Sequence, residues 1–288
     1  MNLIEKIKKI PGGITWRAER YWKEYILKLP LHTRRFFVLR TRALKEKRQL
    51  LTARGKYGHL YKKDDNPLVS VTIPTWNRGK LLTEKVLPRV LAQTYQNIEV
   101  VIVGDHCTDD TAERIAALND TRIRFLNLDK RAEYPQDKHH RHMSAGAIPN
   151  TKAHSLARGL WLAHVDDDDV WELDHLESLL RFARGKDLEI AWGKMSYEYA
   201  PGEWDVQGSP EFKKYDIPHS TVMMRTYLRL YKPEPKTWKL EMGGDRHRLR
   251  RMYYSGVRGG FLDKIVTLGP LRPGTTKQWA LAEDREVI

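Results

Sequence analysis

Short apolar runs alternate with helix-like segments from residue 68 onwards, and this alternation limits the folds that the chain can adopt. The apolar runs, which we predict to be strands, are residues 68–73, 98–103, 123–126 and 160–165. Apolar residues at helical spacing mark the segments between them, residues 80–93, 110–118 and 151–158. Almost wholly apolar strands are typical of a parallel sheet covered by helices on both faces. The sequence therefore predicts an α/β fold with a mainly parallel sheet.

Polar residues directly follow three of these strands, in the segments Pro74–Arg78, Gly104–Asp109 and Asp166–Asp169. In open α/β sheets, ligands bind beyond the carboxyl ends of the strands, so the three segments are expected to meet in one crevice. The alternative is that the first segment is only a turn and that Thr108 and Asp109 only cap the next helix. No glycine-rich phosphate loop follows the first strand, which argues against ATP-hydrolysing and dinucleotide-binding proteins.

Four consecutive aspartates, Asp166–Asp169, end the fourth predicted strand. Adjacent carboxylates repel one another unless a positive group lies among them. A divalent cation such as Mn²⁺ or Mg²⁺ is suited to this place, because hard cations bind carboxylate oxygens and leave positions for water and phosphate. Alternate carboxylates can share one ion, which singles out Asp166 and Asp168. The alternative is that the run caps a helix predicted at residues 173–183 and binds no metal.

Four motifs occur in a fixed order between residues 68 and 171. They are Val69–Arg78, Val90–Asp105, Thr108–Thr111 and Ala157–Trp171. At this spacing they resemble the family 2 glycosyltransferases of GT-A fold, and the resemblance weakens beyond Asp174. It implies a Rossmann-like sheet with helices on both faces, in a metal-dependent transferase that inverts the anomeric carbon. It also implies a nucleotide-diphosphate sugar as the donor, which we expect to be a UDP-sugar.

The resemblance implies roles for individual residues. The donor-binding residues would be Pro74, Thr75, Asn77, Arg78, Asp105, Asp166 and Asp167. The first four would line the nucleobase and ribose. Asp105 would accept a hydrogen bond from the base edge, and Asp166 would contact ribose or sugar. Asp168, the second acid of the D-x-D element, would hold Mn²⁺ or Mg²⁺ on the diphosphate, where a cation offsets developing charge. His219, which opens a strand predicted at residues 220–224, is a further candidate metal ligand, and the alternative is a histidine bonded to the backbone.

An inverting displacement also needs a general base for the acceptor hydroxyl. In the family, this base is an acid at the start of a helix beyond the metal motif, a position that Asp245 matches. Gly244 stands where the family has a second acid, and Glu241 is the alternative base. Asp245 could also be a helix cap paired with neighbouring arginines. Residues 133–150, which contain His139–His142, are expected to form a mobile lid without a metal site.

The part of the chain after the D-x-D element is expected to bind the acceptor, a glycan or a lipid-linked sugar. Aromatic side chains suit the apolar faces of sugars, and core packing is the alternative role for such side chains. The aromatic candidates are Trp192, Tyr197, Tyr199 and Trp204. The expected process is the synthesis of a cell-surface polysaccharide or glycoconjugate.

Positive charge is concentrated at the N-terminal end of the chain. Residues 1–63 contain 18 Lys and Arg against 4 Asp and Glu, which accounts for the whole net charge of +14. Residues 14–29 and 32–54 have the spacing of amphipathic helices. These helices either pack on the main domain or attach the protein to an anionic membrane surface. Nucleic acid is a less favoured partner.

We expect three parts in the chain. They are a basic helical extension at residues 1–65, a GT-A domain at residues 66–269 with its nucleotide-binding half at 66–171 and its acceptor half at 172–269, and a tail at 270–288. The single cysteine, Cys107, excludes an internal disulfide and fits a reducing compartment. No apolar run has the length of a membrane span or of a secretory signal. We therefore expect a cytoplasmic enzyme, peripheral at the inner face of the membrane.

Two other functional classes remain open at this point. A sugar nucleotidyltransferase would share the strands and the metal-binding acids, but should show a glycine-rich phosphate loop near its start. A non-enzymatic protein that binds nucleic acid or membrane through its basic arm would not need the aspartates.

Overall fold

The computed structural model describes residues 29–212 and 217–271. The chain divides into a small unit that ends at Arg42 and a larger unit that begins at Ala43. Helix α3 (Leu29–Tyr57) contains this boundary and confirms the second helix predicted in the basic region.

Two predicted segments lie almost wholly outside the described residues. They are the helix at residues 14–29 and the tail at residues 270–288. The domain boundary that we place at residue 65 stays a prediction. Within the described residues, no helix combines the length and the apolar character that a membrane span requires.

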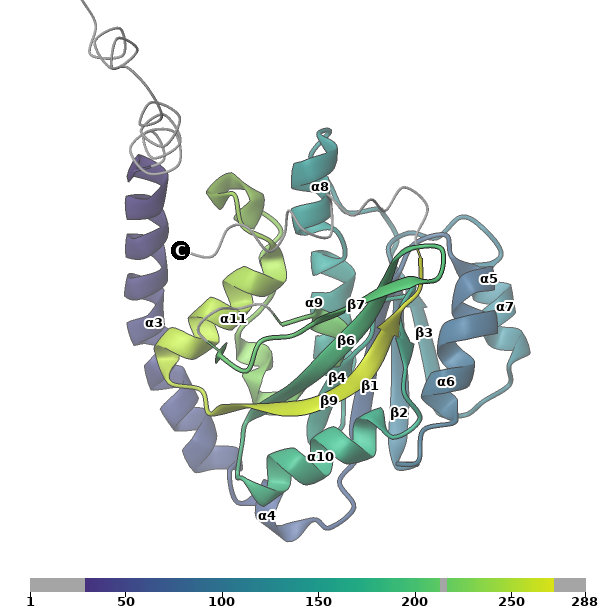
Figure 1. Cartoon of the computed structure of the whole chain (residues 1–288), viewed down its shortest axis with the longest axis horizontal. Helices are drawn as coiled ribbons and strands as arrows, with labels where there is room; N and C mark the ends of the chain where they lie inside the picture. Colours follow the sequence, from purple (N-terminus) through teal and green to yellow (C-terminus); the bar gives the residue numbers. More distant parts are fainter. Residues whose placement is uncertain (1–28, 213–216, 272–288) are drawn as a thin grey trace, which may run out of the picture. The chain divides into compact units, whose positions relative to one another are not determined.

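Nine strands form one sheet in the larger unit (Figure 1). Their order is β3-β2-β1-β4-β8-β6-β9-β5, and β7 pairs with β6 outside this path. The strands before the aspartate run are β1 (Val69–Thr75), β2 (Ile98–Gly104), β3 (Ile123–Asn127) and β4 (Trp161–His164). These four strands pair in parallel, as predicted. Their carboxyl ends therefore lie along one edge of the sheet.

The other half of the sheet is mixed. Its strands are β5 (Val170–Trp171), β6 (Ile190–Ala200), β7 (Glu203–Gln207), β8 (Val222–Arg225) and β9 (Gly259–Gly269). Strand β8 lies antiparallel between β4 and β6 and joins the two halves. Strand β9 runs parallel to β6 and antiparallel to β5. The predicted α/β fold class is confirmed.

Helices cover both faces of this sheet. After α3 they are α4 (Leu60–Lys63), α5 (Gly79–Leu81), α6 (Leu87–Leu91), α7 (Thr111–Ala117), α8 (Lys138–Ser144), α9 (Ala147–Leu156), α10 (His175–Gly185) and α11 (Gly244–Ser255). On one face, Val71 and Ile73 of β1 belong to a core that includes α6 and α10. On the other face, Val101 and Val103 of β2 pack against Ala153 of α9. In Figure 1, α10 crosses in front of the sheet and α9 lies behind it.

The helix predicted at residues 80–93 is interrupted by a π-helical turn, Leu82–Val86, between α5 and α6. The backbone N–H of Leu87 donates to the carbonyl of Leu82, five residues earlier. Pro88 has no backbone N–H and cannot continue the regular α-helical pattern, so a wider turn accommodates it.

Residues 133–150, for which we expect a mobile lid, contain α8 and the first turn of α9. The carboxylate of Asp137 begins α8 by accepting hydrogen bonds from the backbone N–H groups of His139 and His140. Helix α9 starts at Ala147, four residues earlier than predicted. That this segment moves as a lid stays a prediction.

The second half of α3 is tied to the rest of the larger unit. Leu50 is fully buried in the main core. Arg54 donates from Nε and Nη2 to the two oxygens of Glu189, at 2.7 and 2.6 Å. Glu46 forms a buried ion pair with Arg251 of α11. These contacts make the helix from Ala43 onwards part of the larger unit.

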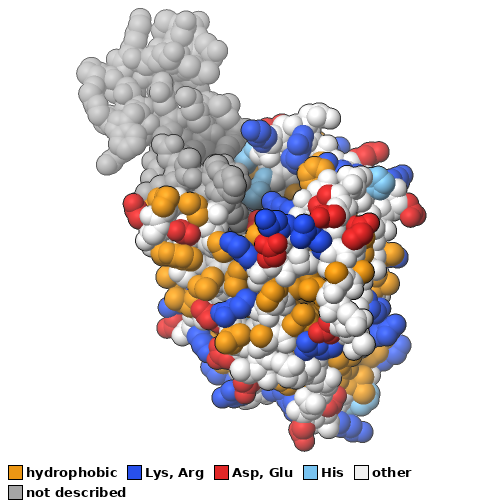
Figure 2. All heavy atoms as spheres, turned by 90° about the vertical axis from the view of Figure 1, so that its right-hand side faces the viewer, with side chains coloured by type: hydrophobic (Ala, Val, Ile, Leu, Met, Phe, Trp, Pro, Cys, Tyr) orange, Lys and Arg blue, Asp and Glu red, His pale blue; other side chains and the backbone are white. Residues whose placement is uncertain are grey.

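Charges of both signs are interspersed on the face of the molecule seen in Figure 2. This agrees with the sequence, in which the Lys and Arg residues beyond residue 63 equal the Asp and Glu residues in number, at 33 of each. The concentration of positive charge is a property of the first 63 residues alone.

Candidate active site

The three strand-end segments come together at the carboxyl edge of the parallel strands. The backbone N–H of Asp105 donates to the carbonyl of Thr75 at 2.8 Å. Asn77 exchanges two hydrogen bonds with Thr108, through its amide oxygen and its amide nitrogen. Asn77 has a φ of 51°, a left-handed conformation that asparagine tolerates better than most residues. The segment after β1 therefore contacts the segment after β2, as expected for a ligand crevice.

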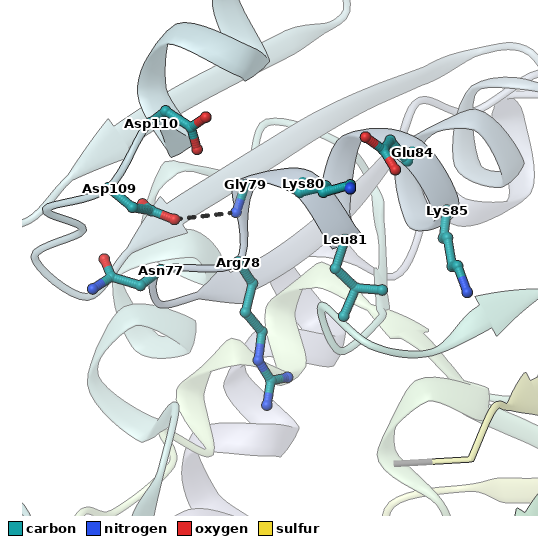
Figure 3. Close-up of a pocket in the computed structure, with 9 residues that line it drawn as sticks. All are labelled: Asn77, Arg78, Gly79, Lys80, Leu81, Glu84, Lys85, Asp109 and Asp110. Atoms are coloured by element: carbon teal, nitrogen blue, oxygen red, sulfur yellow. Dashed lines mark hydrogen bonds between the residues drawn. The ribbon is translucent and has the colours of Figure 1, made fainter. Parts of the chain in front are cut away.

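The start of α5 lines a surface pocket of about 400 Å³ (Figure 3). Asp109 and Asp110 lie on one side of it, and the backbone N–H of Gly79 donates to Asp109 at 3.5 Å. The side chain of Arg78 points away from both of these acids. It reaches the aspartate run instead, although the resemblance places it against the nucleobase and ribose.

The four aspartates have different partners. Nη1 of Arg78 lies 2.7 Å from Oδ1 of Asp167 and 2.7 Å from Oδ2 of Asp168. Asp169 is almost fully buried and accepts a hydrogen bond of 2.5 Å from the hydroxyl of Ser220. Burial raises the pKa of Asp167, which Arg78 opposes. An arginine thus supplies positive charge that the sequence analysis assigned to a metal ion alone.

Asp166 faces two histidines. Nε2 of His164 lies 2.9 Å from Oδ1 of Asp166, and the ring of His164 stacks on that of His219 with centroids 3.7 Å apart. One ligand atom from each of these three residues lies within 4.8 Å of the others. This is the one group of three possible metal ligands in the parts of the chain that the structure describes.

The donor set of this group fits a divalent metal, because a carboxylate and two imidazoles are common metal ligands. Two imidazoles favour a transition metal over Mg²⁺, which prefers oxygen. Asp166 and His219 are predicted ligands that the structure brings together. Asp168 pairs with Arg78 instead, and His164 was not predicted. His164 ends β4 two residues before Asp166, and residues two apart in an extended chain face the same way, so this spacing was a signal in the sequence.

Asp245 also lies close to His219. It occupies the first turn of α11, and its Oδ1 is 3.5 Å from Nδ1 of His219. Its side chain is 49% exposed, so an acceptor can reach it. Burial lowers the pKa of His219 to about 4, so this ring is neutral near pH 7. We call Asp166, His164, His219 and Asp245 the acid–histidine row.

His219 differs from its predicted setting. It opens a 3₁₀ turn, His219–Thr221, and β8 begins only at Val222. The hydroxyl of Ser220, in the same turn, accepts a hydrogen bond of 3.0 Å from the backbone N–H of Asp166. This turn therefore holds His219 next to the aspartate run.

Glu241, the alternative base, is engaged elsewhere. Its Oε1 lies 2.9 Å from Nε2 of His140, which belongs to α8. The other ring nitrogen of His140 lies 2.8 Å from Asp137. The two carboxylates raise the pKa of His140, the hydrogen bond with Glu241 most strongly. Glu241 directly follows the 3₁₀ turn Thr237–Leu240, so its contact with His140 connects this turn to the expected lid.

Asp105, the residue expected to contact the base, is buried and already accepts two hydrogen bonds. Its oxygens accept from the backbone N–H of Ala132 at 3.0 Å and from the hydroxyl of Tyr134 at 2.5 Å. Arg131 places its guanidinium 3.2 Å from the ring centroid of Trp76. The contact of residues 131–134 with this strand end was not predicted, because nothing in a loop sequence indicates which strand end the loop will cover.

The aromatic candidates for acceptor binding have different environments. Trp192 is buried in the core and donates its ring N–H to the carbonyl of Ser209 at 2.9 Å, so it cannot be a sugar platform. Tyr197 and Tyr199 are half-buried on β6. Trp204, on β7, is 46% exposed. Three of the four candidates therefore remain accessible on one hairpin.

The model of glycosyl transferase family 2 matches residues 70–253, which is more than half of the chain. The chain belongs to glycosyltransferase family 2. The predicted resemblance is confirmed, and glycosyltransferase is the enzyme class of this family.

Curated relatives match over part of their length. Glycosyltransferase GlyG of Streptococcus pneumoniae is 31% identical over 140 residues, which are 48% of this chain and 42% of GlyG. WfgD of Escherichia coli, a UDP-Glc:alpha-D-GlcNAc-diphosphoundecaprenol beta-1,3-glucosyltransferase, is 28% identical over 129 residues, 45% of this chain and 46% of WfgD. The chain thus matches less than half the length of these relatives.

Solved structures share the fold. Staphylococcus aureus TarS 1–349 in complex with UDP-GlcNAc superposes with a TM-score of 0.56 at 22% identity, over 72% of this chain and 59% of TarS 1–349. Mannosyltransferase PcManGT of Pyrobaculum calidifontis, in complex with GDP-Man and Mn²⁺, gives 0.53 at 17% identity, over 82% of this chain and 70% of PcManGT. The predicted GT-A fold is confirmed.

Proposed function

We propose that the protein transfers one sugar from a nucleotide-diphosphate sugar to a hydroxyl group of an acceptor, with inversion at the anomeric carbon. The observation that carries this proposal is the acid–histidine row, which joins the first acid of the D-x-D element to Asp245 through two stacked rings. An inverting transferase needs a cation site for the diphosphate and a base for the acceptor. The row offers both side by side.

Asp245 is the residue that we assign as general base. It lies at the N-terminal turn of α11, where the helix dipole favours the ionised carboxylate. The acceptor hydroxyl attacks the anomeric carbon and gives its proton to Asp245, while the bond to the diphosphate breaks on the opposite side. This displacement inverts the carbon.

A bound Mn²⁺ or Mg²⁺ would offset negative charge on the departing diphosphate. Asp166, Asp168 and His219 would hold this ion, and His164 would complete the set. Near them, Pro74, Thr75 and Asn77 would line the donor together with Asp167.

A uridine nucleotide is the donor that we favour. The carboxylate of Asp105 accepts hydrogen bonds, so it suits a base with a ring N–H, such as uracil, and disfavours cytosine, which presents a lone pair there. The names of WfgD and of the TarS complex contain UDP-sugars, which agrees with this choice. The GDP-Man of the PcManGT complex is the competing possibility, because guanine also carries a ring N–H.

We propose a glycan or a lipid-linked sugar as the acceptor, in cell-surface polysaccharide synthesis. Two relatives carry names that assign them to colanic acid and teichuronic acid biosynthesis, and WfgD is named for a diphosphoundecaprenol acceptor. Trp204 and its neighbours on the β6–β7 hairpin are the candidate contacts for acceptor sugars.

A lipid-linked acceptor agrees with attachment to an anionic membrane through residues 1–63, at the inner face. In the described part of this region, Leu44 and Leu51 are exposed on α3 close to Lys47 and Arg48. Because Leu50 and Glu46 are part of the core, the test should substitute surface residues rather than remove the helix. Flotation with anionic liposomes should be weaker for Leu44→Ser/Leu51→Ser, and equal flotation would refute the attachment.

Donor hydrolysis and transfer with Mn²⁺, over a panel of nucleotide sugars, test the function. We expect Asp245→Asn to lower kcat by about 10²- to 10⁴-fold with little change in UDP affinity, because only the proton acceptor is lost. Asp168→Asn should abolish turnover, because it removes a cation ligand from the diphosphate. Asp263→Asn is the matched control, since Asp263 is exposed and pairs with Lys194 on the neighbouring strand. Native turnover in both Asp245→Asn and Asp168→Asn would overturn the proposal.

The first alternative, a sugar nucleotidyltransferase, predicts a different product. Such an enzyme would release pyrophosphate from UTP and a sugar phosphate, and the chain lacks the glycine-rich loop for this. A nucleic-acid-binding protein would show binding that weakens steeply with salt and that survives Asp168→Asn.

A further inference from the structure

We propose that Arg78 is a built-in counter-cation for the aspartate run, which a divalent metal and the donor diphosphate displace together. This inference rests on the proposed function, because it concerns the cation site of the same reaction. It changes the expected role of Arg78 from contact with the nucleobase to charge pairing at the aspartate run. It also predicts that metal binding and donor binding are coupled.

The first argument is the position of one nitrogen atom. Nη1 of Arg78 bridges Asp167 and Asp168 at 2.7 Å from each, so a single cationic atom serves two carboxylates. A bridging metal ion would have the same relation to a pair of acids. The two aspartates are 12% and 13% exposed at their side chains, whereas Arg78 is 46% exposed. The acids are therefore fixed in the wall of the site, and the arginine is the partner that can leave.

The second argument is that Arg78 pairs with the buried acids of the aspartate run and not with the exposed acids next to it. Asp109 and Asp110 line the same pocket as Arg78, yet its side chain points away from them (Figure 3). A solvated surface arginine gains little from any one exposed acid. Asp167 and Asp168 are mostly buried carboxylates, and leaving them unpaired would be costly. The need of the aspartate run for a counter-charge therefore determines where Arg78 lies.

The third argument is electrostatic exclusion. A metal ion on Asp168 would lie within a few ångströms of the guanidinium, and two cations at that distance repel strongly in a partly buried site. Metal alone must therefore break charge-assisted hydrogen bonds of Arg78 before it binds well. A diphosphate changes this balance, because its oxygens offer the released guanidinium a bidentate partner. Metal and nucleotide diphosphate should thus strengthen each other's binding.

Mn²⁺ binding, followed by the electron paramagnetic resonance signal of free Mn²⁺, tests this inference without any turnover. We expect Arg78→Gln to bind Mn²⁺ alone about tenfold more tightly than the native chain, because the competing hydrogen bonds are gone. Arg78→Lys keeps the charge and should bind Mn²⁺ nearly as weakly as the native chain. Arg181→Gln makes the same change of charge at an exposed pair with Glu177 on α10, and should leave Mn²⁺ affinity unchanged.

The second measurement is the gain in Mn²⁺ affinity when UDP is added, corrected for Mn²⁺ bound by free UDP. We expect this gain to be large in the native chain and to shrink by about tenfold in Arg78→Gln. In the variant there is no arginine for the diphosphate to draw away from Asp167 and Asp168. Arg78→Met replaces the glutamine variant if the latter does not fold. Mn²⁺ binding by folded Arg78→Gln or Arg78→Met that is equal to or weaker than that of the native chain would overturn the inference.

Failure of this inference differs from failure of the proposed function. If the native chain and Arg78→Gln bind Mn²⁺ alike, while native donor hydrolysis still requires Mn²⁺ and Asp168, only the role of Arg78 is refuted. If the native chain binds no nucleotide sugar with or without Mn²⁺, the function itself fails and the inference fails with it.

Discussion

At the scale of single residues, His164 was given no role from the sequence, and the structure places it in the candidate metal site. It ends β4, contacts Asp166 through Nε2, and stacks on His219. We predict that His164→Phe, which keeps the stacked ring but removes the nitrogen, weakens Mn²⁺ binding about 10- to 100-fold. Isothermal titration with Mn²⁺ in the presence of UDP measures this effect.

The control for this substitution is a second histidine with a stacked ring. His175→Phe keeps the stack on Trp171, where the ring centroids are 4.0 Å apart, and that pair is not part of the acid–histidine row. It should leave Mn²⁺ affinity unchanged. Mn²⁺ affinity that is native in His164→Phe would remove His164 from the metal site and leave Asp166, Asp168 and His219 as its proposed ligands.

The candidate site could be predicted from the sequence only where chemistry marks it locally. The acids after β4 and the acid at the start of α11 stand out because carboxylates at strand and helix ends are visible in sequence. His164 looked like part of an apolar strand. The pairing of Arg78 with Asp168 joins residues 90 positions apart, and its direction depends on tertiary packing. The hydrogen bond from Tyr134 to Asp105 could not be predicted for the same reason.

At the scale of elements, the ion pair between α3 and Glu189 is the contact with the clearest energetic consequence. Glu189 is fully buried and accepts hydrogen bonds from Arg54, from the hydroxyl of Tyr227 at 2.6 Å and from the backbone N–H of Arg258 at 2.7 Å. Burial alone would raise the pKa of Glu189, but these donors together lower it. The carboxylate is therefore stabilised in its ionised form.

We predict that Arg54→Met lowers the free energy of unfolding by about 1–3 kcal/mol at pH 7, because Glu189 keeps its charge but loses two donated hydrogen bonds. In the native chain, the lowered pKa adds stability above the ordinary pKa of 4.5, and this is lost as the pH falls through the folded value. The deficit of the variant should therefore shrink towards pH 4. Urea unfolding at both pH values measures it.

Arg181→Met is the matched control for this experiment, since it breaks an exposed pair with Glu177 within α10. It should change the free energy of unfolding by less than about 0.5 kcal/mol. A deficit in Arg54→Met that stays constant from pH 7 to pH 4 would mean that packing of the arginine stem, and not charge on Glu189, stabilises this contact within the larger unit.

The elements themselves were predicted unevenly. Strands β1 to β4 are apolar, short and bounded by polar segments, so they lie within two residues of their predicted limits. Helix α8 was missed because its sequence, Lys138–Ser144, is rich in histidine and has no apolar period. The hairpin of β6 and β7 was recognised only as an aromatic-rich stretch, since half-exposed strands have no continuous apolar run.

At the scale of the whole molecule, a junction around Trp171 and His175 ties the outer strand β5 to the rest of the mixed half of the sheet. The ring N–H of Trp171 donates to the carbonyl of Ser220 at 2.7 Å, which ties β5 to the turn before β8. Nδ1 of His175 lies 2.9 Å from the carbonyl of Val266 on β9 and donates to it. Sequence periodicity predicts the parallel half of the sheet. It does not predict this junction, because the contacts join strands that are distant along the chain.

This junction makes the stability of the whole fold depend on pH. Burial lowers the pKa of His175 to about 3, against an ordinary value of 6.5 in the unfolded chain. Between these values the unfolded chain binds a proton that the folded chain does not, so the free energy of unfolding falls as the pH falls below 6.5. One such group removes about 2 kcal/mol between pH 7 and pH 5.

We predict that His175→Phe is less stable than the native chain at pH 7 by about 1 kcal/mol, because the carbonyl of Val266 loses its donor. At pH 5 the order should reverse, since phenylalanine keeps the stack on Trp171 and pays no protonation penalty. Urea unfolding at pH 7, 6 and 5 measures both differences, with His59→Gln, an exposed position before α4, as the control that keeps the native slope. Parallel stability curves for native and His175→Phe would show that the ring is charged in the folded protein, and that burial at this junction is looser than the contacts of His175 indicate.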